Sequence, residues 1–153
     1  MLIREQPATE LTVATRILAR TGALDDTGRI TMRLGDVVYV AGRAVSNHTM
    51  TPYDVVAVLV MDGTSFAGEP PEDIDTYVAI YRTDEEVQSV ARANDGALVS
   101  AASVRACAIG MLVRHRGTPV NDPATLERTW LDLVAEAKVA GALIGAFPTG
   151  QED

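Results

Sequence analysis

An unbroken apolar run is the feature that most constrains the fold of this chain. Residues 55–61 read Val-Val-Ala-Val-Leu-Val-Met, without a polar or charged side chain. A strand with one face in water alternates apolar and polar residues, so a continuous run favours a strand covered on both faces. Asp62-Gly63 follows, one of the strongest turn dipeptides, and residues 64–67 then return as the second strand of a hairpin. The sequence therefore predicts a central strand in a sheet with packing layers on both sides.

A second hairpin precedes this one. Residues 28–34 alternate apolar and polar side chains, and residues 37–41 form a β-rich run after Gly35-Asp36. This pattern is typical of two antiparallel strands joined by a tight turn. A polar loop, residues 42–52, connects the two hairpins.

The remaining elements follow from apolar periodicity and helix-end signals. We expect an amphipathic helix over 9–21 that ends near Gly22, and a helix opening at Asp122-Pro123, an N-cap acceptor followed by proline. The other predicted elements are a helix over 72–82, a strand over 87–93, a helix over 97–107 and a short strand over 110–113. The resulting fold class is α/β: a three-layer αβα domain whose mixed, mostly antiparallel central sheet is flanked by helices. Its length and apolar content predict a single domain over residues 1–153.

Charge and composition exclude several classes of partner. The net charge of −8 disfavours nucleic acid and anionic membrane surfaces, since both bind a basic face. No apolar run approaches the ~20 residues that span a bilayer, and the first residues lack a signal-peptide pattern. One cysteine, Cys107, excludes an internal disulfide and fits a reducing compartment. We expect a cytoplasmic protein, and the Ala, Arg, Val and Asp bias is typical of GC-rich bacterial genes.

Several short motifs occur in an order that resembles one known family. The segments are Gly28-Arg29-Ile30-Thr31-Met32-Arg33, the Asp62-Gly63 turn, Pro70-Pro71-Glu72-Asp73 and Tyr81-Arg82. Over about residues 11–144 the chain resembles the class II aldolase and adducin head-domain family, as a shortened member. The resemblance implies that fold, a small-molecule substrate and a homo-oligomer, usually a tetramer, with active sites near subunit contacts.

The resemblance also implies a divalent metal, but the ligand positions have changed. Family members bind it through a His-x-His pair and a later histidine, and the pair corresponds here to Arg92 and Asn94. His115 lies in a segment that weakly resembles the motif carrying the family's later histidine. A zinc site of this type needs three protein ligands, so we expect neither a metal nor another cofactor. The acids Glu72, Asp73 and Asp75 could hold magnesium, or they could be solvated groups at a helix start.

The resemblance implies a candidate site with new chemistry at the old ligand positions. Asp73 lies nearest the family's acid/base, Tyr77 would be a second proton donor, and the Arg92 guanidinium could stabilise an oxyanion. The candidate substrate-binding residues are Arg29, Thr31, Arg43, His48 and Asn94. Arg92 could instead form an internal salt bridge with Asp73 or Asp75, and His48 could be an ordinary surface residue.

Two functions remain open from the sequence. The first is a metal-independent enzyme that acts on a small anionic or carbonyl-containing metabolite by proton transfer, as a lyase, decarboxylase, isomerase or cyclase. The alternative is a non-catalytic binding or assembly module like the adducin head domain. An enzyme should bring Asp73, Tyr77, Arg92 and Asn94 together around a hollow, whereas an assembly module should have that hollow filled.

Overall fold

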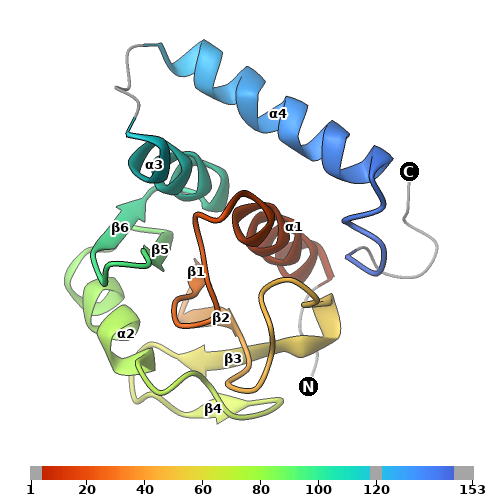
Figure 1. Cartoon of the computed structure of the whole chain (residues 1–153). Helices are drawn as coiled ribbons and strands as arrows, with labels where there is room; N and C mark the ends of the chain where they lie inside the picture. The colour runs from red at the N-terminus through yellow and green to blue at the C-terminus, as the bar shows by residue number, and fades with distance from the viewer. Residues whose placement is uncertain (1–4, 118–121, 147–153) are drawn as a thin grey trace.

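The chain folds into a sheet covered by helices on both faces (Figure 1). The computed structural model describes residues 5–117 and 122–146. The helices are α1 (Glu5–Thr21), α2 (Ile74–Thr83), α3 (Val104–Arg116) and α4 (Pro123–Val139), with a 3-10 turn, η1, at Pro52–Asp54. The strands are β1 (Ile30–Leu34), β2 (Val37–Ala41), β3 (Val55–Leu59), β4 (Ser65–Phe66), β5 (Ser89–Arg92) and β6 (Leu98–Ala101).

Both predicted hairpins are present and form the larger part of the sheet. Within the described residues the strand order is β4-β3-β2-β1-β5-β6, and every pairing is antiparallel. The apolar run predicted as a central strand forms β3, which pairs with β2 on one side and β4 on the other. The sheet is thus antiparallel throughout, where the sequence favoured a mixed one.

Strand alternation divides the apolar side chains between two cores. One set of strand residues packs with Tyr77, Val78 and Tyr81 of α2. The other set packs under α1 and α3, and α4 lies outside these two helices, contributing Trp130 to the same core (Figure 1). These layers confirm the predicted three-layer αβα fold. No helix in the described part of the chain is long and apolar enough to cross a membrane.

The region after β5 differs from the sequence prediction. Residues 97–107 were expected to be a helix, but Leu98–Ala101 pairs with β5 as the edge strand β6. The helix starts later, because the Ser103 hydroxyl accepts a hydrogen bond from the Ala106 N–H and caps α3. The strand expected over 110–113 lies inside α3, where its apolar residues form the buried face of the helix. A short apolar run is compatible with a strand or a helix, and here the Ser103 cap places residues 110–113 in the helix.

Burial makes Cys107 a packing residue. It lies on the core side of α3 and is fully buried. Burial raises the pKa of its thiol to about 11, so the sulfur is protonated at neutral pH. This agrees with a structural role for the side chain.

Arg16 of α1 anchors the segment after α4 to the loop before η1. Its Nε donates to the Met50 carbonyl at 2.7 Å, and its Nη1 donates to the carbonyls of Ala142 at 3.2 Å and Ile144 at 2.5 Å. Its Nη2 reaches the Thr49 carbonyl at 3.3 Å. One guanidinium therefore joins three segments that are distant in the sequence.

We predict that Arg16→Met lowers the free energy of unfolding by about 2 kcal/mol, since hydrogen bonds from a charged donor contribute ~1.5–3 kcal/mol. Urea denaturation measures the change. The matched control is Arg20→Met, one turn along α1, whose ion pair with Glu136 spans 3.9 Å between largely exposed side chains. That substitution should cost less than about 1 kcal/mol. Equal losses for the two variants would contradict the anchoring role.

Candidate active site

A cleft of about 360 Å³ lies where the sheet meets the start of α2. Its walls come from the segment before β1, the loop after β2, the segment before α2 and the end of β5. The lining residues are Asp26, Thr27, Arg29, Arg43, Pro71, Glu72, Asp73 and Arg92. The cleft therefore collects three arginines and three acidic residues from four separate stretches of the chain.

Close backbone approach holds two of these arginines beside each other. The Arg92 N–H donates to the Arg29 carbonyl at 3.0 Å, which extends the β1–β5 pairing to the residue before the start of β1. A Cβ atom at Gly28 would lie 2.4 Å from the Arg92 carbonyl oxygen. Only glycine allows this approach, so Gly28 is required for the geometry of the cleft.

Asp73 and Arg92 form an ion pair on the wall of the cleft. Arg92 Nη1 donates to Asp73 Oδ2 at 3.0 Å, and the side chains are 38% and 19% exposed. Asp73 is the N-cap residue of α2, but its carboxylate does not cap the helix. The salt bridge that the sequence left as an alternative is therefore present, and both of its members line the cleft.

Tyr77 lies beneath this pair, one helical turn after Asp73. It is fully buried, and its hydroxyl oxygen accepts a hydrogen bond from the Arg29 N–H at 3.2 Å. The pKa of the Tyr77 hydroxyl is raised above its ordinary value, first by burial and then by the neighbouring Asp73 carboxylate. The phenol thus keeps its proton, and it does not line the cleft itself.

Arg29 places a positive charge in the floor of the cleft. Its side chain is only 4% exposed. Nη1 donates to Asn47 Oδ1 at 2.7 Å, and Nη2 donates to the carbonyls of Gly42 at 3.0 Å and Val45 at 2.7 Å. Burial lowers the pKa of Arg29, and the Asp26 carboxylate opposes that shift. All these hydrogen-bond acceptors are neutral, so they satisfy the donors without cancelling the charge.

Asn47 organises the cleft and was not among the residues predicted from the sequence. Besides accepting from Arg29, its fully buried side chain donates to the carbonyls of Asp25 at 2.7 Å and Gly28 at 3.0 Å. Its backbone N–H donates to Asp26 Oδ1 at 2.7 Å. In the sequence, Asn47 is simply one polar residue of a loop, and nothing there distinguishes it from its neighbours.

Arg43 lies at the rim. Its Nε donates to the Pro70 carbonyl at 3.1 Å, and its Nη1 is 3.4 Å from a carboxylate oxygen of the exposed Glu69. These contacts join the loop after β2 to the segment before α2. The guanidinium remains accessible to a molecule in the cleft.

Three predicted substrate contacts lie outside this cleft. Thr31 is fully buried on the α2 side of the sheet, and its hydroxyl is bonded to the Tyr81 hydroxyl at 2.7 Å and the Val90 carbonyl at 2.8 Å. His48 is exposed in the loop after β2 and does not line the cleft. Asn94 lies in a different pocket.

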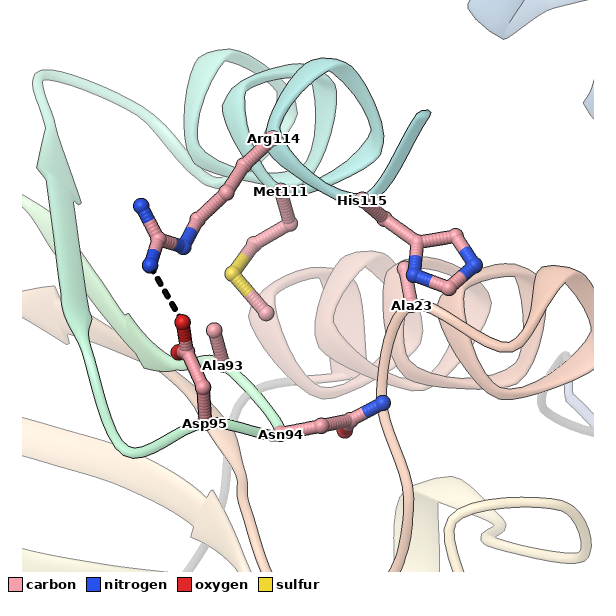
Figure 2. Close-up of a pocket in the computed structure, with 7 residues that line it drawn as sticks. All are labelled: Ala23, Ala93, Asn94, Asp95, Met111, Arg114 and His115. Carbon is pink, nitrogen blue, oxygen red and sulfur yellow. Dashed lines mark hydrogen bonds and ion pairs between the residues drawn. The ribbon is translucent and has the colours of Figure 1, made fainter. Parts of the chain in front are cut away.

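That second pocket, of about 390 Å³, lies between the end of α3 and the β5–β6 turn (Figure 2). Its lining residues are Ala23, Ala93, Asn94, Asp95, Met111, Arg114 and His115. The Asn94 side chain bridges to the loop after α1: Oδ1 accepts from the Asp25 N–H at 2.8 Å, and Nδ2 donates to the Gly22 carbonyl at 3.0 Å. Across the pocket, Arg114 pairs with Asp95 at 2.5 Å. Asn94 thus has a structural role in this turn.

These positions do not fit the three-histidine metal centre implied by the resemblance. In a continuing strand, residue 94 would face the same side as Arg92. Instead β5 ends at Arg92, and a tight turn closed by the Ala93 N–H to Ala97 carbonyl bond, 2.8 Å, takes Asn94 into the second pocket with His115. Arg92 is itself a cation and is paired with Asp73. Within the described ranges, no three His, Cys, Asp or Glu side chains are grouped to hold a metal ion.

Comparisons with solved structures give the same fold. An aldolase II superfamily protein from Pseudomonas syringae matches 93% of this chain and 96% of its own, with a TM-score of 0.66 and 14% identity. The L-fuculose 1-phosphate aldolase from Glaciozyma antarctica PI12 matches 58% of this chain and 40% of its own, with a TM-score of 0.51 and 23% identity. YgbL from Escherichia coli, a putative aldolase/epimerase/decarboxylase, matches 57% and 44%, with a TM-score of 0.50 and 20% identity.

The match thus spans less than half the length of the last two proteins. No curated protein sequence matches the chain significantly. A family model, described as the class II aldolase and adducin N-terminal domain, matches residues 9–135. That match extends from α1 into α4, and the chain belongs to the class II aldolase and adducin N-terminal domain family.

Proposed function

We propose that this protein is an enzyme that acts on a small anionic or carbonyl-containing metabolite by proton transfer, without the metal used by its family. The reaction would be of the lyase, decarboxylase, isomerase or cyclase type. The observation that carries the proposal is the Asp73–Arg92 pair, a carboxylate and a guanidinium 3.0 Å apart on the wall of an accessible cleft. A base and a fixed cation side by side are the two groups that proton removal next to a carbonyl needs.

The pair allows charge to move without leaving the guanidinium uncompensated. As Asp73 takes a proton from the carbon beside the carbonyl, its negative charge is lost and an enolate oxygen gains one. Arg92, released from the carboxylate, can then donate to that oxygen. Tyr77 lies behind Asp73 as a protonated phenol, so we assign it a positioning role. In the resting protein Arg92 is paired with the Asp73 carboxylate. During the reaction the enolate oxygen takes the place of that carboxylate as the anionic partner of Arg92.

Arg29 and Arg43 supply the binding charge. Arg29 is held by neutral acceptors, so its field extends into the cleft, whereas Arg43 at the rim can bind an anionic group directly. The two solved structures of aldolase and of aldolase/epimerase/decarboxylase type support chemistry of the lyase class on this fold. Fold alone does not determine the reaction, so the assignment depends on the site.

We further propose a single domain and a homo-oligomeric assembly, with a tetramer as the expected form by family. Three apolar side chains on or near α4 support an assembly surface, because Leu131, Val139 and Ile144 are exposed. Light scattering coupled to gel filtration measures the mass in solution. A monomer at all concentrations would contradict the assembly.

We predict that the protein catalyses exchange of the hydrogen next to the carbonyl in at least one small oxo acid in deuterated water, followed by proton NMR. Asp73→Asn should lower this rate by about 10²–10⁴-fold, the usual contribution of a positioned base. Arg92→Ala should lower it by about 10²–10³-fold through loss of the oxyanion donor.

Glu86→Gln, an exposed acid in the α2–β5 turn, is the matched control and should leave the rate unchanged. Arg92→Lys should recover part of the activity, because it keeps a positive charge. Full activity in Arg92→Ala would contradict the role of Arg92 in oxyanion stabilisation. Full activity in Asp73→Asn would contradict the role of Asp73 as the base.

We also predict that the reaction does not depend on zinc. The purified protein should contain less than stoichiometric zinc by elemental analysis, and exchange should persist after treatment with a chelator. Because residues 92 and 94 face different pockets, Arg92→His/Asn94→His should still fail to bind Co²⁺ with the absorption spectrum of a tetrahedral site. Stoichiometric zinc in the wild-type protein, together with activity lost on chelation, would overturn this proposal.

A further inference from the structure

The cleft carries charges of both signs, and their existing partners show which remain available to a ligand. Asp73 is paired with Arg92. Asp26 accepts from two neutral donors, the Asn47 N–H at 2.7 Å and the Ser46 hydroxyl at 3.4 Å, and its negative charge acts on the buried Arg29. The Glu72 carboxylate forms no hydrogen bond or ion pair with any residue that the structure describes, and it lines the cleft. A full negative charge is therefore available at the start of α2.

Positive charge is available in the same cleft. Arg92 donates through Nη1 to Asp73. Arg43 donates through Nε to the Pro70 carbonyl, and its Nη1 pairs with the exposed Glu69. Their remaining N–H groups can donate to a ligand. Arg29 adds a buried charge that forms no ion pair with the described residues, although the nearby Asp26 carboxylate partly offsets it. The guanidinium groups favour a carboxylate, which they bind through paired hydrogen bonds.

The start of α2 is poorly suited to a dianion. Pro71 has no N–H to offer, and the Ile74 N–H is taken by the Pro71 carbonyl at 3.1 Å. Besides Asp73, which is paired with Arg92, Glu72 and Asp75 place two carboxylates at this end of the helix, and their charge outweighs the half-charge of the helix dipole. A phosphate group bound by the arginines would meet the unpaired Glu72, whereas an ammonium group would be attracted to it.

We propose that the cleft binds a zwitterion, a small carboxylic acid that also carries an ammonium group, and that Glu72 determines this specificity. The carboxylate contacts Arg43 and Arg92 above the buried Arg29, and the ammonium group contacts Glu72. This substrate class rests on the proposed function, because it uses the same cleft. It restricts that function to an amino-bearing acid and excludes a phosphorylated one.

The test is a binding series with matched probes on the full-length protein at low salt and pH 7, measured by ligand-observed NMR titration. L-Alanine carries an ammonium group where L-lactate carries a hydroxyl group. O-Phospho-L-serine differs from L-serine by a phosphate group. We expect L-alanine to bind roughly two- to fivefold more tightly than L-lactate, as expected for one accessible ion pair. L-Serine should likewise bind more tightly than its phosphorylated form.

The variant Glu72→Gln should bring the alanine-to-lactate ratio close to one and improve the binding of O-phospho-L-serine. Glu86→Gln should leave both preferences unchanged, and circular dichroism confirms that each variant is folded. Raising the salt concentration on the wild-type protein provides a second measure, because it should weaken alanine binding more than lactate binding.

Equal or tighter binding of lactate, tighter binding of O-phospho-L-serine, no effect of Glu72→Gln, or no binding of any probe would each overturn the zwitterion assignment. These results are separable from the proposed function. Hydrogen exchange that depends on Asp73, without a preference for zwitterions, would support the proposed enzyme function and refute this substrate class. A preference for zwitterions that depends on Glu72, without hydrogen exchange that depends on Asp73, would support the ligand class and refute the proposed reaction.

Discussion

Burial of the Arg29 guanidinium is the interaction on which the cleft depends. Removing a charge from water is costly unless all its donors are satisfied. Here Asn47 and the carbonyls of the loop after β2 satisfy them. That requirement ties the loop to the start of β1, while Asn47 also bonds the segment before β1. The walls that carry Asp26, Arg43 and Arg92 are thereby held around one fixed cation, and an anionic ligand would meet a preformed charge.

The end of β5 determines the difference between this chain and the metal-dependent pattern that it resembles. Replacement of two histidines would by itself remove a metal centre, but the backbone goes further. Because the strand stops at Arg92 and turns, residue 94 lies with Arg114 and His115 in a separate pocket (Figure 2). Arg92 remains in the cleft and pairs with Asp73. The change therefore affects the direction of the side chains as well as their identity, and it leaves a carboxylate and guanidinium where the catalytic groups are expected.

Local signals in the sequence were sufficient for much of the fold. The Asp62-Gly63 turn and the apolar run before it predicted β3 and its hairpin, and Asp122-Pro123 predicted the start of α4, where the Asp122 carboxylate does accept from the Ala124 N–H. The prediction failed between residues 97 and 113. Small residues there have no strong periodicity, and pairing with β5 made a strand of the first part. Ser103, capping α3 through its hydroxyl, then set where the helix begins.

The sequence by itself determined the family, the order of the β-hairpins and the candidate groups Asp73, Arg92, Arg29 and Arg43, because turn dipeptides, apolar runs and motif order are local properties of the chain. Only the tertiary structure decided which of these groups meet. Strand parity places Thr31 and Arg29 on the same face, but the packing of Tyr81 seals Thr31 while the loop after β2 leaves Arg29 at the cleft floor. The role of Asn47 and the bonds that hold Asn94 to the loop after α1 also arise from contacts between residues far apart in the sequence. Such contacts depend on how the chain closes on itself, and no single stretch of sequence encodes them.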